Sequence, residues 1–202
     1  MHPFGESDYQ GTYRTSLNGP VYGLWSGKIG RDDFMEQFEL AIEVGIRKAW
    51  LAGLEKAGIA KDEITQEDET ALASFVLEQF DHVGGFADYI ELHSKANGGK
   101  LASLQARLSL WANAYNKAVN AAMAAAAANP LLRWNRNPQK DSCADCIYAD
   151  GRVYRKSVWL KWGWTPAAKN LACSGILCGC GWEVVPKGTR ENKGHPRRPS
   201  GA

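Results

Sequence analysis

The first 142 residues of this 202-residue chain contain no cysteine, and the sequence lacks several other patterns that would assign it to a common class. Residues 1–30 show no basic segment followed by an apolar one, so nothing indicates secretion into an oxidising compartment. The longest apolar run, residues 121–128, is far shorter than the ~20 residues of a membrane-spanning helix. Residues 1–130 contain no nucleophile elbow, no phosphate-binding glycine-rich loop and no His-Glu metal motif. We therefore expect neither a membrane protein nor an enzyme.

All five cysteines lie in the last third of the chain, as a pair followed by a triplet. Two residues separate Cys143 from Cys146, and 26 residues separate Cys146 from the triplet Cys173, Cys178 and Cys180. With this spacing, two tight turns of backbone can bring four thiolates around one tetrahedral ion. The spacing therefore predicts a structural zinc site, and it leaves open which four of the five cysteines bind.

Three other uses of these cysteines agree less well with the sequence. Five thiols cannot all pair in disulfides. A thioredoxin-like redox motif needs a preceding strand, whereas Cys143 follows the polar segment 135–142. A zinc deaminase needs a His-x-Glu or Cys-x-Glu motif, which the sequence does not contain. The histidines are interpreted as ordinary helix or tail residues; they are His2, His82, His93 and His195.

Charge is divided unevenly along the chain. Residues 1–130 carry 11 Lys and Arg against 17 Asp and Glu, a net charge of −6, and residues 131–202 carry 13 against 5, a net charge of +8. A basic segment is typical of contact with a polyanion, most commonly nucleic acid, although the same charges also suit a solvated surface. The candidate contact residues are Arg152, Arg155, Lys156, Lys161, Arg190, Arg197 and Arg198.

The sequence predicts an α+β fold that begins with a helical domain. After an irregular arm over residues 1–30, residues 31–130 are expected to form a helical bundle. Apolar residues recur at helical spacing over residues 32–57. A second helix is expected to begin near Thr65, because Thr65 and Asp68 approximate a capping box.

The clearest periodicity belongs to residues 101–125. Apolar residues recur there in alternating steps of three and four, which predicts a heptad-patterned helix. Toward the end of the helix these residues are alanines, so another backbone can approach closely there. Asn129 and Pro130 are expected to end the helix. The pattern leaves open a core helix of a single-chain bundle and an intermolecular coiled coil.

Residues 131–186 are expected to form a small cysteine-rich α+β module stapled by the metal. Short strands are predicted at residues 131–134, 152–154 and 182–185, with a turn at Asp150-Gly151. We interpret the nearby tryptophans as a core rather than as a base-stacking platform, since a module of this size has few aliphatic residues; they are Trp159, Trp162 and Trp164. Residues 187–202 contain no apolar anchor and are expected to be a mobile basic tail.

Several motifs follow one another in a fixed order over residues 100–186. They are Leu110-Trp-Ala-Asn-Ala-Tyr-Asn-Lys-Ala, Arg133-Trp134, Asp141-Ser-Cys-Ala-Asp-Cys, Asp150-Gly151, Trp159, Gly163, Pro166 and Cys173-x4-Cys-Gly-Cys. With these motifs the chain resembles the phage head morphogenesis family, the Mu F-like minor head proteins. Many members end the module with a His-Pro-x-Cys-Arg-Cys type of sequence, and Cys173 stands here near the position of that histidine.

The resemblance implies a virion component, made in the host cytoplasm, and not an enzyme. Proteins of this family are minor capsid proteins at the portal vertex that act in head assembly, DNA packaging or genome delivery. The implied partners are portal or other capsid proteins and double-stranded DNA, and a homo-oligomer stays open. The residues alone also suit a stand-alone zinc-ribbon-like nucleic-acid-binding regulator.

Overall fold

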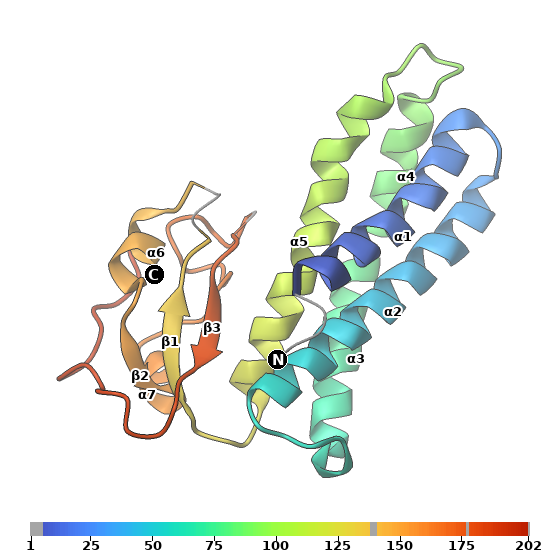
Figure 1. Ribbon diagram of the computed structural model, residues 1–202. Helices are drawn as coiled ribbons and strands as arrows, with labels where there is room; N and C mark the ends of the chain where they lie inside the picture. Colours follow the sequence, from blue (N-terminus) through green and yellow to red (C-terminus); the bar gives the residue numbers. More distant parts are fainter. Residues whose placement is uncertain (1–5, 138–140, 177, 202) are drawn as a thin grey trace. The chain divides into compact units, whose positions relative to one another are not determined.

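A computed structural model describes residues 6–137, 141–176 and 178–201 (Figure 1). The chain forms two compact units. The first contains Met1–Lys48 and Thr70–Tyr115, and the second contains Ala49–Glu69 and Asn116–Ala202. Three helices contribute residues to both units: α2 (Arg31–Lys56), α3 (Gln66–Phe80) and α5 (Leu101–Ala125).

The first unit opens with a helix where the sequence predicted an irregular arm. Helix α1 spans Glu6–Ser26, and residues 1–5 of the expected arm lie outside the described residues. Three glycines and Pro20 make this segment a poor helix by intrinsic propensity, which is why it was not predicted. Its buried residues nevertheless recur at steps of three and four, and packing of that face overrides propensity; they are Tyr13, Leu17, Val21 and Leu24.

An aromatic cluster forms the core of the first unit. The rings of Phe86 on α4 (Val83–Leu92) and Trp111 on α5 lie 4.6 Å apart, and Phe38 on α2 meets Trp111 edge-on at 5.3 Å. Such offset and edge-to-face pairs add to the stabilisation from burial. Close packing continues at Gly45, where an added Cβ would lie 2.1 Å from the Tyr13 ring.

The predicted start of the second helix is confirmed. The backbone N–H of Thr65 donates to the Asp68 carboxylate at 3.0 Å, and the Asp68 N–H donates to the Thr65 hydroxyl at 3.2 Å. This reciprocal pair satisfies two N–H groups that α3 would otherwise leave without partners. A short 3-10 turn, η1 (Lys61–Glu63), precedes it.

The second unit contains a three-stranded antiparallel sheet in the order β2-β1-β3 (Figure 1). The strands are β1 (Leu131–Asn135), β2 (Val153–Arg155) and β3 (Gly181–Val184). Two short helices accompany the sheet, α6 (Ala144–Ala149) and α7 (Lys156–Lys161). The prediction of helices combined with a small sheet is therefore confirmed.

Tryptophans form the core of this sheet module, as predicted from the shortage of aliphatic residues. Trp134, Trp159 and Trp164 are fully buried, and the Trp134 and Trp164 rings meet edge-on at 5.4 Å. The Trp159 indole N–H donates to the Leu132 carbonyl at 3.0 Å, so its polar atom is satisfied. Trp162 differs, because it is only half-buried and stacks on His195 at 3.7 Å.

The C-terminal segment is anchored, so the expectation of a free tail over residues 187–202 is wrong for its described part. Asn192 pairs with Val153 twice: the Val153 N–H donates to the Asn192 side chain at 2.7 Å, and the Asn192 N–H donates to the Val153 carbonyl at 2.9 Å. Pro196 and Pro199 are buried. The anchors are prolines and hydrogen bonds, which a search for large apolar residues overlooks; Ala202 lies outside the described residues.

The alanine-rich end of α5 allows a close approach of backbones, as predicted. A Cβ added at Gly53 of α2 would lie 2.3 Å from the Val119 carbonyl oxygen and 2.7 Å from the Ala122 Cβ. Only glycine on one helix and small residues on the other permit this approach. Helix α5 ends at Ala125, four residues before the expected stop at Asn129.

Candidate metal centre

The fold gathers the five cysteines into two overlapping groups. The thiols of Cys143, Cys146 and Cys173 lie within 4.8 Å of one another, and so do those of Cys146, Cys178 and Cys180. Cys146 belongs to both groups. With Zn–S bonds of about 2.3 Å, the sulfurs of a tetrahedral zinc site lie about 3.8 Å apart, so small side-chain movements suffice to bind an ion. The cluster could therefore hold a metal ion, and its sulfur-only donor set suits zinc.

Local backbone geometry places each cysteine. Cys143 directly precedes α6 and Cys146 lies in its first turn, while Cys180 directly precedes β3. Cys173 begins a turn in which Ser174 and Gly175 adopt φ angles of 50° and 69°. Glycine is required at position 175, because a Cβ there would lie 2.0 Å from the Ala167 carbonyl oxygen.

Asn120 of α5 fastens the Cys178-Gly-Cys180 turn. Its side-chain amide donates to the Cys180 carbonyl at 3.3 Å and to the Asn116 carbonyl at 2.8 Å, and its oxygen accepts from the Trp182 N–H at 3.2 Å. Asn120 is only 3% exposed. This buried amide holds the backbone on both sides of Gly181 and so fixes where the Cys180 sulfur projects.

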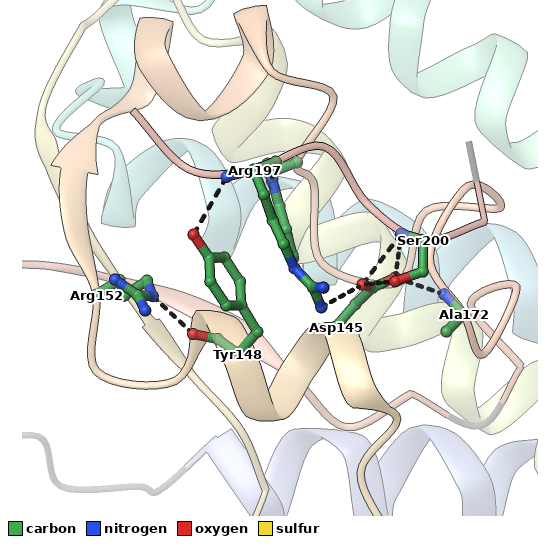
Figure 2. Close-up of polar contacts among 7 residues, drawn as sticks. Asp145, Tyr148, Arg152, Ala172, Arg197 and Ser200 are labelled. Carbon is green, nitrogen blue, oxygen red and sulfur yellow. Dashed lines mark hydrogen bonds and ion pairs between the residues drawn. The ribbon is translucent and has the colours of Figure 1, made fainter. Parts of the chain in front are cut away.

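Asp145, which the sequence analysis missed, joins both cysteine loops to the C-terminal segment (Figure 2). Its fully buried carboxylate accepts from the Ala172 N–H at 2.8 Å, from the Ser200 hydroxyl at 2.7 Å and from the Ser200 N–H at 3.0 Å. The Arg197 guanidinium lies 3.3 Å away. Burial by itself raises the pKa of Asp145, but these donors outweigh burial and hold the pKa below its usual value. An acidic residue inside a Cys-x-x-Cys motif is the signal that could have identified it.

The thiols influence each other's ionisation strongly. Hydrogen bonds from the Cys146 and Cys180 thiols hold the pKa of Cys178 far below its usual value, whereas hydrogen bonds with Cys178 and Cys180 raise the pKa of Cys146. Burial raises the pKa of Cys173 to about 11. Burial raises the pKa of Cys143, but hydrogen bonds with Cys146 and Cys173 outweigh burial and lower it. The cluster thus favours thiolates at Cys143 and Cys178 and opposes negative charge at Cys146, Cys173 and Cys180. A divalent cation reverses this opposition, since it favours the thiolate form of every sulfur that it binds.

The basic residues predicted to contact nucleic acid fall into two groups. Arg152 and Arg197 place their guanidinium groups 4.2 and 4.5 Å from the Tyr148 ring, and Arg152 donates to the Tyr148 carbonyl at 2.7 Å, so both are engaged within the module (Figure 2). The second group consists of the exposed residues Arg155, Lys161, Arg190 and Arg198; Arg197 is exposed as well, but it contacts Tyr148 and Asp145.

The prediction that Lys156 contacts nucleic acid is wrong. Lys156 is 6% exposed, and its ammonium donates to the carbonyls of Ala124, at 3.2 Å, and Ala126. These carbonyls lie at the C-terminal end of α5, where a cation is favoured by the helix dipole. Burial lowers the pKa of Lys156. From the sequence, a lysine at the end of a predicted strand is expected at the surface. Only the packing of Lys156 against α5 shows that this lysine is buried.

Comparison with known proteins returned no matching family model, no matching curated protein and no matching solved structure. Within residues 6–137, 141–176 and 178–201, no helix combines the length and the apolar character needed to cross a membrane.

Proposed function

We propose that this chain is a structural component of a phage head, a minor head protein whose C-terminal module is held together by one zinc ion. In this role it binds portal or other capsid proteins at the portal vertex and contacts packaged DNA. The metal is structural and takes no part in a reaction. Its contribution is to replace, for the small sheet module, part of the hydrophobic core that the module is too short to build.

One observation carries this proposal: most of the motifs of the resemblance that follow residue 130 contribute residues to the core, the turn or the cysteine cluster of the module. Trp134 and Trp159 are fully buried in its core, and Gly151 occupies its turn with a φ of 74°. All five cysteines of the motif lie in the cluster. Motif residues that define a fold, rather than a surface, support kinship in architecture with the minor head proteins.

The uneven distribution of charge supports a separate partner for each part of the chain. Residues 1–130 carry the net charge of −6 and suit a protein partner, while residues 131–202 carry +8 and suit DNA. Among the predicted contact residues, Arg155, Lys161, Arg190 and Arg198 are exposed and available for phosphates.

We also propose that the heptad pattern of α5 serves packing within the chain rather than a coiled coil between chains. In support of this, the pattern's central residues are buried within the single chain; they are Leu104, Leu108, Trp111, Tyr115, Ala118 and Ala122.

The head-protein proposal is tested on particles. The phage is induced, its heads are purified on a density gradient, and peptides of this chain are quantified against those of the major capsid protein. We expect a few copies per head, and defective heads when the gene is deleted. Absence of the chain from intact, infectious particles that contain every other head protein would contradict the proposal.

A second candidate is a zinc-ribbon-like nucleic-acid-binding regulator. The observation that favours it is the position of exposed Arg198, whose guanidinium lies 5.8 Å from the centre of the half-exposed Trp162 ring, next to exposed Lys161. A selection from random duplex DNA with the full chain separates the candidates. Enrichment of one sequence favours the regulator, whereas sequence-independent binding that weakens steeply with salt favours the head protein.

A further inference from the structure

We propose that the ion has three permanent ligands, Cys146, Cys178 and Cys180, and a fourth that Cys143 and Cys173 supply in alternation. The fifth cysteine is thus not a spare residue but a second occupant of one coordination position. This inference rests on the proposed zinc centre and specifies its ligands.

The overlap of the two sulfur groups leads to this assignment. Cys146, Cys178 and Cys180 form one group within 4.8 Å, and Cys143 and Cys173 lie within 4.8 Å of the same Cys146 sulfur. A tetrahedral zinc with the first group as three ligands has one position left, and Cys143 and Cys173 are the two remaining thiols beside Cys146 that could fill it. Both are close enough to reach it, and only one can occupy it.

Burial separates the permanent ligands from the alternating ones. Cys146, Cys178 and Cys180 are 1%, 6% and 4% exposed, whereas Cys143 and Cys173 are only half-buried. Four-coordinate zinc leaves one of five sulfurs unbound. If Cys143 or Cys173 is the unbound thiol, it stays in contact with solvent. If a cysteine of the buried group were unbound, its thiol would be enclosed in the module without the metal.

The structure keeps both alternating ligands in place whichever one is bound. Asp145 lies between Cys143 and Cys146 and accepts a hydrogen bond from the N–H of Ala172, the residue before Cys173 (Figure 2). The two loops are therefore tied together through a buried carboxylate. Exchange then requires rotation of a cysteine side chain between staggered positions, with no movement of either loop.

Alkylation of the zinc-loaded, full-length protein tests this assignment. In a brief reaction with iodoacetamide, the unbound thiol first gives its proton to the buffer, and the resulting thiolate displaces iodide to form a thioether. Native mass spectrometry selects molecules that carry one zinc and one label, and peptide mapping locates the label. We expect it on Cys143 in some molecules and on Cys173 in others, with Cys146, Cys178 and Cys180 protected.

Four results would overturn the assignment: label confined to one of the two residues, label on a buried cysteine, two labels with zinc retained, or complete protection of all five thiols. A chain that carries two zinc ions overturns it as well. A purified chain that binds no zinc at all is a different failure, because it removes the proposed centre together with this inference.

Variants loaded with Co²⁺ provide a second measurement. Cys143→Ser and Cys173→Ser should each keep the thiolate-to-cobalt absorption of four sulfurs, with affinity lowered only about twofold, since one of two bound arrangements is lost. The double variant should lose about a quarter of that absorption, because one of four thiolates is gone. Cys178→Ser, the matched control in the buried group, should lose absorption as a single variant. If Cys143→Ser or Cys173→Ser alone lost as much thiolate-to-cobalt absorption as the double variant, the ligand set would be fixed and the proposal wrong.

Discussion

Single polar side chains carry much of the organisation of the cysteine module, and Asp145 is the most connected of them. Its carboxylate joins residues distant in sequence, Ala172 and Ser200, and lies beside Arg197. Because it is buried and charged, each donor that it binds offsets part of the cost of removing it from water.

Asp145→Asn should destabilise the zinc-loaded protein by about 3 kcal/mol, because the amide places a donor where Ala172 or Ser200 also donates and leaves Arg197 without its charge partner. Urea unfolding followed by tryptophan fluorescence measures this. Asp150→Asn is the control, since Asp150 pairs with Arg136 at the surface. It should cost at most about 1 kcal/mol. Equal effects of the two substitutions would contradict the role given to Asp145.

Lys156 shows how a surface-type residue becomes internal. Lys156→Met should reduce stability by roughly 1–2 kcal/mol, because the carbonyls of Ala124 and Ala126 lose their donor. Lys161→Met, on the exposed side of the same helix, should change stability by no more than about 0.5 kcal/mol. Affinity for DNA should fall more for Lys161→Met than for Lys156→Met. A larger loss of DNA affinity for Lys156→Met would support the original prediction that Lys156 contacts nucleic acid.

At the scale of elements, sequence patterns identified what depends on local chemistry and missed what depends on packing. The capping box at Thr65 and the strand β1 were predictable, because adjacent residues determine them. Helix α1 was not, because its burial depends on partners that local propensity does not describe. The candidate site followed the same rule. Cysteine spacing indicated the cluster, and the sequence shows Asp145 inside the Cys-x-x-Cys motif, but the partners of Asp145 and the role of Asn120 became visible only when the loops were in place.

The contact of α1 with α2 gives an element-scale prediction. Gly45→Ala should destabilise the chain by about 1–3 kcal/mol, because the added Cβ would lie 2.1 Å from the Tyr13 ring, which is itself buried. Gly84→Ala in α4 is the matched control, since nothing lies within 4 Å of its added Cβ. Removal of a helical glycine there should be neutral or stabilise by up to about 1 kcal/mol. Thermal unfolding compares the two, and an unaffected Gly45→Ala variant would contradict the close packing.

For the whole molecule, metal removal should affect the two units unequally. The buried tryptophans of the sheet module belong to the same unit as the cysteine cluster, whereas the first unit has its own aromatic core around Phe86 and Trp111. A strong chelator should therefore abolish most of the near-ultraviolet circular dichroism that the sheet module's buried tryptophans contribute, and leave most of the helical far-ultraviolet signal. Restored zinc should reverse the change. Near-ultraviolet signals unaffected by chelation would mean that the module does not need the ion.

The most direct measurement is the metal content of the intact chain purified under reducing conditions, by native mass spectrometry together with elemental analysis. We expect one zinc per chain, bound through thiolates, and its loss on acidification as protons compete for the sulfurs. A folded chain with an ordered sheet module, five free thiols and no bound metal would contradict the claim that sulfur ligands gathered about an ion hold this module together.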